Sequence, residues 1–201
     1  MNKQWQYTTP GIPDHLFVRG KVPMTKEEIR VITLAKARLG PCMVVWDLGS
    51  GTGSISVEAA MMVPEGQVFA VEKSLEGVAL TKDNAVRFAL NNIVSVAGEA
   101  PDVLLDLPRP HRIIVGGSGG KLKEILDVAE EKLLPGGRMV INAVTLDTLE
   151  KAINCLHTPW TTDIVQVTMA RSEMVGHSHL LRGTNPVFII TAWREEEKHE
   201  G

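Results

Sequence analysis

An acid and three glycines directly follow an apolar run in the segment VVWDLGSGTG, residues 44–53. The run up to Trp46 is typical of a buried strand, and Asp47 stands at its end. The three glycines follow at alternate positions, before a stretch with helical character. A strand, a glycine turn and a helix in this order present backbone N–H groups to a nucleotide-like ligand. The segment therefore predicts a binding site of that type.

Two carboxylates narrow down the ligand. A dinucleotide-binding loop has the spacing G-x-G-x-x-G, but here Ser54 stands where the third glycine belongs. Asp47 would repel a pyrophosphate, whereas it suits the ammonium and sulfonium groups of S-adenosyl-L-methionine. A second apolar strand ends in Glu72, 19 positions after Gly53, near the roughly 20-residue offset at which an acid meets ribose hydroxyls. The combination resembles the class I S-adenosylmethionine-dependent methyltransferases. The competing interpretation is a plain glycine turn between two surface acids.

Composition restricts the class further. A length of 201 residues fits one domain with a sizeable core. The net charge of −3 and the absence of a Lys/Arg run argue against a nucleic-acid partner. The sequence shows no apolar signal core and no run of membrane-spanning length, so we expect no membrane association. Cys42 and Cys155 are isolated thiols without metal spacing, which favours a cytoplasmic location.

Apolar runs and amphipathic stretches alternate along the chain, which predicts an α/β architecture. The expected strands are residues 43–48, 67–72, 93–97, 112–116 and 138–143. The expected helices are residues 25–39, 53–62, 76–89, 121–133 and 146–156. Thr25 and Glu28 have the spacing of a capping box at the start of the first helix. Such alternation requires a mostly parallel sheet with helices on both faces.

The pattern changes after the last helix. Residues 162–171 and 187–194 are strand-like with no helix between them, which predicts a terminal antiparallel hairpin that closes the sheet. The expected fold is a Rossmann-like class I methyltransferase fold with a mostly parallel, seven-stranded sheet. Three prolines mark residues 1–24 as an irregular N-terminal arm. We expect this arm to contribute to the substrate site. We expect residues 25–194 to form a single methyltransferase domain and residues 195–201 a charged tail.

The loop after the fourth strand argues against methylation of nitrogen. Methyltransferases that act on amino groups of bases or of glutamine usually carry N/D-P-P-Y/F at this place. Here residues 116–120 read GGSGG, without a proline or an aromatic ring to clamp a planar amine. Glycines allow the backbone to approach a bulky ligand closely, although a plain flexible turn would use them too.

Several segments together resemble one family, the decarboxylating cobalt-precorrin carbon-15 methyltransferases of cobalamin biosynthesis. They are GIPD (11–14), PMTKEEIR (23–30), DLGSGTG (47–53), GEAP (98–101), IVGGS (114–118) and LPGGRMVIN (134–142). The resemblance implies methylation of carbon 15 of cobalt-precorrin-6B, with decarboxylation of the ring C acetate at carbon 12, giving cobalt-precorrin-7. The chain ends at residue 201, without the second methyltransferase domain of the aerobic route, so we expect the stand-alone anaerobic version.

The resemblance also implies site residues. For S-adenosyl-L-methionine they are Thr25, Asp47, Gly49, Ser50, Gly51, Thr52, Gly53, Glu72, Glu99 and Ala100. Thr25 would contact the cofactor from the start of the first helix. The glycine loop would lie under the methionine moiety, Glu72 would take the ribose hydroxyls, and Glu99 and Ala100 would lie against the adenine. No catalytic acid or base stands out.

The substrate carries many carboxylates, so its pocket should offer cations and a close-approaching backbone. The candidates are His15, Arg19, Lys21, Gly117, Ser118, Lys121, His177, His179 and Arg182. We expect the arm (11–23) and the loop 172–185 to close over the tetrapyrrole. His177 and His179 are spaced as a metal pair but lack an evident third ligand, so no protein metal site is expected.

Several alternatives remain open at this point. A protein isoaspartate O-methyltransferase shares the glycine loop, a tRNA adenine methyltransferase is disfavoured by charge, and an oxidoreductase is disfavoured by Asp47 and Ser54. A non-catalytic cofactor-binding module is a further possibility. We also expect a homo-oligomer, by resemblance a tetramer. Trp5, Tyr7 and the last two strands offer apolar surface that one small domain need not expose.

Overall fold

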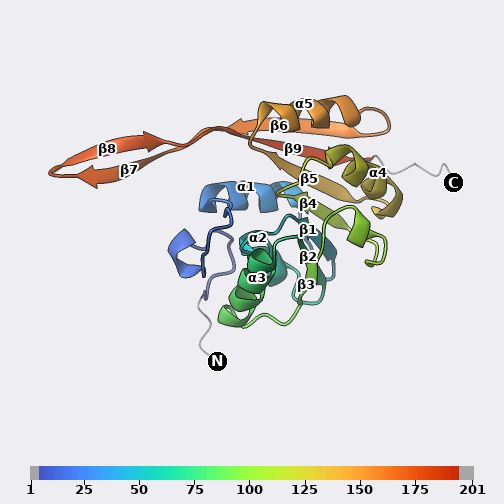
Figure 1. Ribbon diagram of the computed structural model, residues 1–201, viewed down its shortest axis with the longest axis horizontal. Coiled ribbons are helices and arrows are strands. Elements are labelled where there is room, and N and C mark those ends of the chain that lie inside the picture. Colours follow the sequence, from blue (N-terminus) through green and yellow to red (C-terminus); the bar gives the residue numbers. More distant parts are fainter. Residues whose placement is uncertain (1–4, 195–201) are drawn as a thin grey trace.

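A seven-stranded sheet forms the centre of the computed structural model, which describes residues 5–194 (Figure 1). The strand order is β3-β2-β1-β4-β5-β9-β6. Strands β1 to β5 are parallel, and β9 runs antiparallel between β5 and β6. The strands are β1 (Val44–Leu48), β2 (Gln67–Glu72), β3 (Ile93–Ala97), β4 (Arg112–Val115), β5 (Arg138–Ala143), β6 (Thr161–Val167) and β9 (Val187–Trp193).

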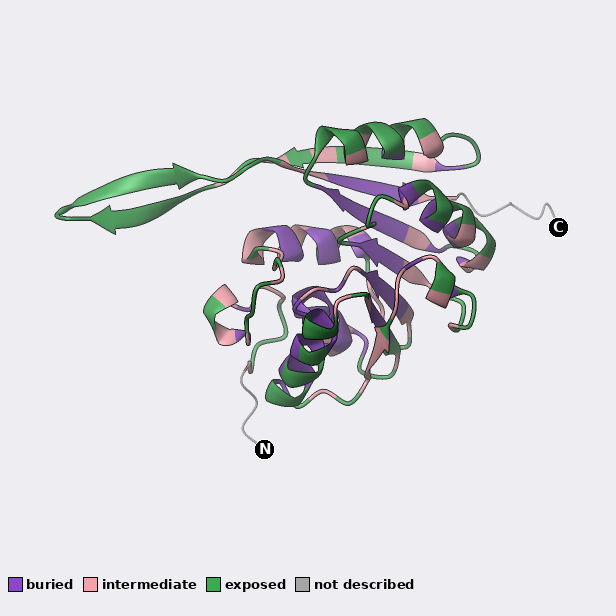
Figure 2. Ribbon diagram, viewed as in Figure 1, coloured by how far each residue is buried: buried purple, intermediate pink, exposed green. Residues whose placement is uncertain are grey.

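Helices cover both faces of the sheet, as predicted. They are α1 (Glu27–Ala37), α2 (Ser54–Met62), α3 (Leu75–Arg87), α4 (Leu122–Lys132) and α5 (Leu146–Cys155), with short 3-10 helices η1 (Asp14–Leu16) and η2 (Asp102–Leu104). Helices α1 and α2 pack with Val45, Ile114 and Val140 on one face, and α3 lies beside α2. Helices α4 and α5 pack with Trp46 and Ile113 on the other. The central strands are therefore buried on both sides, as Figure 2 shows.

Every expected strand and helix is present, and the ends differ by no more than two residues, except that the strand expected at 162–171 already ends at Val167. The predicted capping box is wrong. Helix α1 begins at Glu27, its N-cap is Lys26, and no side chain caps it. Thr25 instead faces a pocket, and the Glu28 carboxylate accepts hydrogen bonds from Arg171. The predicted charged tail, residues 195–201, lies outside the described residues.

The segment between β6 and β9 is not the loop that the sequence predicted. Residues 172–185 belong largely to a two-stranded hairpin of β7 (Ala170–Val175) and β8 (Ser178–Gly183), which pairs apart from the main sheet. The hairpin projects away from the body of the molecule, and every residue in its strands is exposed (Figures 1 and 2). Of residues 172–185, Thr184 and Asn185, which follow the hairpin, line the pocket that Thr25 faces.

Candidate functional site

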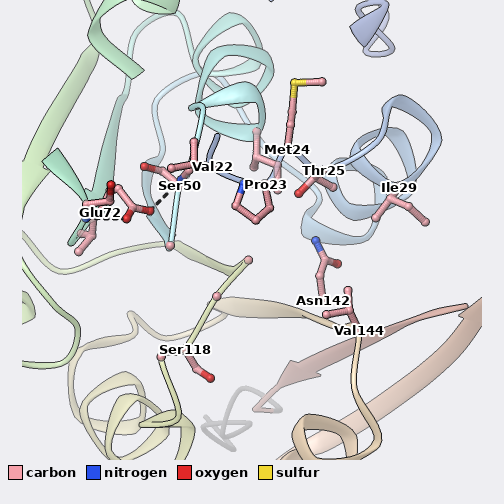
Figure 3. A pocket seen from close by; sticks show the side chains of 18 of the residues that line it. Val22, Pro23, Met24, Thr25, Ile29, Ser50, Glu72, Ser118, Asn142 and Val144 are labelled. Atoms are coloured by element: carbon pink, nitrogen blue, oxygen red, sulfur yellow. Dashed lines mark hydrogen bonds between the residues drawn. The ribbon is translucent and has the colours of Figure 1, made fainter. Parts of the chain in front are cut away.

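The strand order changes direction at β1. From β1 the chain adds β2 and β3 on one side of the sheet, and it then crosses over to add β4 and β5 on the other side. Ligands of open α/β sheets bind at this switch point, outside the carboxyl ends of the strands. A cavity of about 580 Å³ lies there, within the 300–1,000 Å³ typical of small-molecule sites. The loops after β1 to β5, the start of β9 and residues 22–26 line it (Figure 3). Residues 25 and 26 precede α1 and are counted with the arm from here on.

Two glycines of the loop after β1 are required by close packing. A Cβ on Gly49 would lie 2.7 Å from the backbone N and O of Gly117, in the loop after β4. A Cβ on Gly51 would lie 2.8 Å from the carbonyl oxygen of Pro23 in the arm. Both residues also have positive φ, +70° and +56°, which side chains rarely tolerate. The loop thus touches two other walls of the cavity by backbone alone.

Glu72 ends β2 and points back to this loop. Its Oε2 accepts a hydrogen bond from the Gly51 backbone N at 3.0 Å, and its Oε1 accepts one from the Ser74 N at 2.8 Å. A carboxylate has about four acceptor positions, so two remain for a ligand. Glu72 therefore fixes the glycine loop and still offers acceptors to the cavity (Figure 3).

Asp47 lies beneath the loop and does not line the cavity. Its side chain is fully buried, Oδ2 accepts a hydrogen bond from the Ser56 hydroxyl, and Oδ1 has no protein partner. Burial raises the pKa of Asp47 to about 6, the Ser56 hydrogen bonds oppose this rise, and the nearby charge of Glu72 adds to it. Above that pH the buried carboxylate places negative charge under the loop.

Asp47 should make stability depend on pH in an unusual direction. Unfolded, its pKa is near 3.9, so between about pH 4 and 6 the native state holds a proton that the unfolded state has lost. Stability from this group therefore falls as pH rises. The variant Asp47→Asn lacks this titrating group. We therefore expect the difference in free energy of unfolding, variant minus unmutated protein, to rise by on the order of 2–3 kcal/mol between pH 4 and pH 7. Urea unfolding at several pH values measures this, and parallel pH curves for the two proteins would contradict it.

A carboxylate between two lysines lies in the lining of the cavity. Glu99 is 2.9 Å from the Lys121 Nζ and 3.2 Å from the Lys73 Nζ. Hydrogen bonds from Lys121 and then Lys73 hold the pKa of Glu99 below its usual value. The three side chains join the ends of β2 and β3 to the residue that precedes α4. This group links three of the loops that border the cavity.

A buried ionic cluster fixes the N-terminal arm. Arg30 of α1 is fully buried, and its Nε and Nη1 lie 2.8 Å from Glu58 of α2 and from Asp14 of the arm. The guanidinium also donates to the carbonyls of Ile12 and Thr25. Glu58 in turn accepts hydrogen bonds from the backbone N–H groups of Gly11 and Ile12. The cluster thereby holds the arm whose end, residues 22–26, lines the cavity.

The structure brings most of the expected cofactor residues to one cavity. Those that line it are Thr25, Gly49, Ser50, Gly51, Glu72, Glu99 and Ala100, and those that do not are Asp47, Thr52 and Gly53. Of the expected substrate residues, Gly117 and Ser118 line it. His15, Arg19, Lys21, Lys121, His177, His179 and Arg182 do not.

The cations among these residues are dispersed. Lys121 is paired with Glu99, and Arg182 donates to Glu173 on the same hairpin. Within residues 5–194 the structure contains no group of three or more His, Cys, Asp or Glu side chains able to hold a metal ion. No helix in this part of the chain is both long and apolar enough to cross a membrane.

Sequence reasoning missed one side of the cavity. Ile29, Asn142, Val144, Met169 and Val187 line it, from α1, β5 and the segments around β9. One signal was present: Asn142 is a polar residue at the next-to-last position of an apolar strand, whereas Glu72 is an acid at the last position of β2. The apolar members carry no sequence signal that separates them from core residues.

The sheet order, the antiparallel β9 and the glycine loop at the switch point define an α/β methyltransferase. The chain belongs to the precorrin methyltransferase family, because the family model described as a precorrin methyltransferase domain matches residues 15–195. This result favours the family that the sequence segments resembled over the isoaspartate, tRNA adenine and oxidoreductase alternatives.

Individual relatives agree with the family. A protein of Sulfurisphaera tokodaii named a probable cobalt-precorrin-6B C(15)-methyltransferase (decarboxylating) is 44% identical over 184 residues, 90% of this chain and 96% of the relative. The crystal structure of precorrin-6y C5,15-methyltransferase from Geobacter metallireducens has a TM-score of 0.88 and 40% identity, covering 92% of this chain and 98% of that one. The structure of precorrin 8w decarboxylase from Methanobacterium thermoautotrophicum has a TM-score of 0.86 and 33% identity, covering 90% of this chain and 99% of that one.

Proposed function

We propose that this protein is an S-adenosylmethionine-dependent methyltransferase that methylates carbon 15 of cobalt-precorrin-6B and decarboxylates its ring C acetate, giving cobalt-precorrin-7. The observation that carries the proposal is the match to relatives of this name along 90% or more of the chain. The proposed setting is anaerobic cobalamin biosynthesis in the cytoplasm. The N-terminal arm serves the same site, since its residues 22–26 line the cavity.

The cavity fits S-adenosyl-L-methionine in three respects. Its glycine loop approaches by backbone alone, Glu72 keeps free acceptors for two ribose hydroxyls, and the charge of Asp47 beneath the loop suits a cationic ligand. We assign the methionine moiety to the glycine loop, the ribose to Glu72 and the adenine to Glu99 and Ala100. Gly117 and Ser118, in the loop after β4, are assigned to the substrate.

The bound cofactor supplies a methyl group already activated by its sulfonium, so this chain needs no strong base. The chain's own contribution is alignment of the reactants and exclusion of water. The glycine loop and Pro23 fix the cofactor, and the apolar side formed by Ile29, Val144 and Met169 surrounds the tetrapyrrole. In the decarboxylation the bond to the carboxylate breaks, carbon dioxide leaves and the electron pair enters the conjugated ring. The remaining methylene takes up a proton, which balances the proton that the ring gives up where the methyl group enters.

A direct assay tests the proposed function. The protein is incubated with cobalt-precorrin-6B and methyl-labelled S-adenosylmethionine, and the product is measured by mass spectrometry. The expected product gains CH₂ and loses CO₂ relative to the substrate. Methyl transfer to isoaspartyl peptide or to tRNA, without reaction of the tetrapyrrole, would overturn the proposal.

The ribose assignment predicts the effect of one substitution. Glu72→Ala should weaken binding of S-adenosylhomocysteine by about 1.5–3 kcal/mol, the range for hydrogen bonds to a charged group. Titration calorimetry measures the affinity, with Asp83→Ala on the exposed surface of α3 as the control. Unchanged affinity in a folded Glu72→Ala variant would contradict the assignment.

We also propose that the protein forms a homo-oligomer, by resemblance a tetramer, through the hairpin β7–β8. An isolated two-stranded hairpin is marginally stable in water, yet this one exposes Met174, Leu180 and Leu181. One face of it, with Ser172, Leu181, Met174 and His179 in register, carries no acidic or Arg/Lys side chain. Light scattering should give a mass that is a multiple of the 21.9 kDa of one chain. The substitution Leu181→Glu on the hairpin should reduce this mass. A single-chain mass at micromolar concentration would refute the proposal.

A further inference from the structure

One polar side chain on the apolar side of the cavity is left without a function by the assignments above. Asn142 is the next-to-last residue of β5, is 7% exposed and lines the cavity. Its Nδ2 is buried and has no hydrogen-bond partner in the protein. Among residues 5–194, it is the sole side chain that combines such an unpartnered buried atom with a place in the cavity lining. A buried amide without a partner is unfavourable, so a ligand atom is the natural partner.

Thr33 orients this amide. The Thr33 side chain on α1 is fully buried, and its Oγ1 lies 3.0 Å from Asn142 Oδ1 and 2.7 Å from the Ile29 carbonyl oxygen. The hydroxyl has one proton and serves one of these acceptors at a time. When it donates to Asn142, the amide NH₂ faces the cavity, toward the side of Thr25 in Figure 3. A ligand that accepts a hydrogen bond selects this arrangement.

Asn142 lies away from Ser50 of the glycine loop and from Glu72, whereas Thr25, an expected cofactor residue, lies on its side of the cavity (Figure 3). Glu72 lies on the opposite side of the cavity (Figure 3), whereas Ile29, Val144 and Met169 line the same half as Asn142. The two lysines of the lining are already engaged, Lys26 with Asp14 at 3.3 Å and Lys73 with Glu99. Thr184 and Asn185 also line the cavity beside Met169 and Val187 and are uncharged, so a ligand group beside Asn142 meets a neutral donor in uncharged, largely apolar surroundings.

We propose that Asn142 Nδ2 donates a hydrogen bond to the acetate carboxylate of the substrate, with Thr33 as the residue that positions the amide. The inference rests on the proposed function, which supplies a substrate with a carboxylate that is lost. A cation would stabilise the charge of that carboxylate and oppose its loss, whereas a neutral amide orients it with less stabilisation of the charge. Asn142 thus serves to hold the leaving carboxylate in a desolvated position.

Asn142→Asp is the sharpest variant, because it keeps the shape and replaces the donor with a negative acceptor. Binding of cobalt-precorrin-6B is followed by its absorbance in the presence of S-adenosylhomocysteine, and S-adenosylhomocysteine alone by calorimetry. We expect the Kd of the tetrapyrrole to rise at least ten-fold and that of S-adenosylhomocysteine to change less than two-fold. In turnover, release of carbon dioxide should fall at least as much as methyl transfer.

Thr33 supplies a second test if the aspartate disturbs folding. Thr33→Val should raise the Kd of the tetrapyrrole by a smaller factor, and Thr33→Ser, which keeps the hydroxyl, should restore it. Thr191→Val is the matched control, because Thr191 is equally buried on β9 and does not line the cavity; it should change neither affinity.

The outcomes are distinguishable. Unchanged tetrapyrrole affinity in Asn142→Asp, or equal effects of Thr33→Val and Thr191→Val, would overturn the role of Asn142 while the proposed function stands. Loss of S-adenosylhomocysteine binding in Asn142→Asp would place the residue in the cofactor half and also overturn the inference. Failure of the unmutated protein to bind the tetrapyrrole would refute the proposed function, and the inference with it.

Discussion

Gly51→Val should abolish binding of S-adenosylhomocysteine, which we expect as a loss of at least about 100-fold in affinity, or roughly 2.7 kcal/mol. A Cβ at this position would lie 2.8 Å from the Pro23 carbonyl oxygen, which is backbone and cannot rotate away. The residue also has φ of +56°, a conformation that a β-branched residue tolerates poorly. The loop or the arm must therefore move, and both line the cavity. Titration calorimetry with the purified variant measures the loss.

Gly176→Val controls for backbone strain alone. Gly176 lies in the turn between β7 and β8, has φ of +64°, and a Cβ there would meet nothing within 4 Å. We expect this variant to bind S-adenosylhomocysteine as the unmutated protein does. If Gly51→Val retains full affinity, the close approach of loop and arm is not needed for the cofactor, and the assignment of the glycine loop is wrong.

The second large effect concerns stability. Arg30→Met should lower the free energy of unfolding by about 3–5 kcal/mol, because it leaves the buried Glu58 carboxylate without its cation. It also removes the donors to the Ile12 and Thr25 carbonyls. For a chain of this size we expect a decrease in Tm of about 6–20 °C, and weaker cofactor binding because the arm lines the cavity. Thermal and urea unfolding measure the change.

An exposed ion pair is the control for this effect. Lys123 and Asp127 are 2.8 Å apart on α4, with side chains 69% and 61% exposed, so Lys123→Met should change stability by less than about 0.5 kcal/mol. Arg30→Met combined with Glu58→Gln should recover part of the loss, because it removes the unpaired charge and keeps an acceptor for the arm. A loss for Arg30→Met no larger than for Lys123→Met would show that the cluster does not fix the arm.

The main sheet and its helices follow from patterns that are local in the sequence. Apolar runs bounded by turns located the strands, and their alternation with amphipathic stretches required parallel pairing. The hairpin β7–β8 was not predicted, because its strands carry mixed polar and apolar residues and have no buried face. No periodicity in the sequence therefore marks them. The Thr25–Glu28 spacing gave a false helix start, because Arg171 from the distant hairpin takes the Glu28 carboxylate.

The sequence predicted the site residues that are placed by the backbone of the sheet better than those that are placed by side-chain packing. Gly49, Gly51 and Glu72 stand next to strand ends, so their meeting follows from the parallel sheet itself. Asn142 also lies next to a strand end, but only its contact with Thr33, 109 positions away in the sequence, shows that its amide is oriented into the cavity. Contacts of this kind depend on how α1 lies on the sheet, which residue patterns do not specify.

The position of β9 has a consequence for synthesis on the ribosome. Strand β9 lies between β5 and β6, although β6 is translated before it and the hairpin β7–β8 comes in between. Until residues 187–193 emerge, β5 has a free edge and β6 has no partner in the main sheet. Unpaired strand edges invite pairing with other chains. The nascent protein is therefore most exposed to aggregation just before β9 leaves the ribosome, and the side of the cavity that contains Asn142 and Val187 is complete only once β9 has emerged.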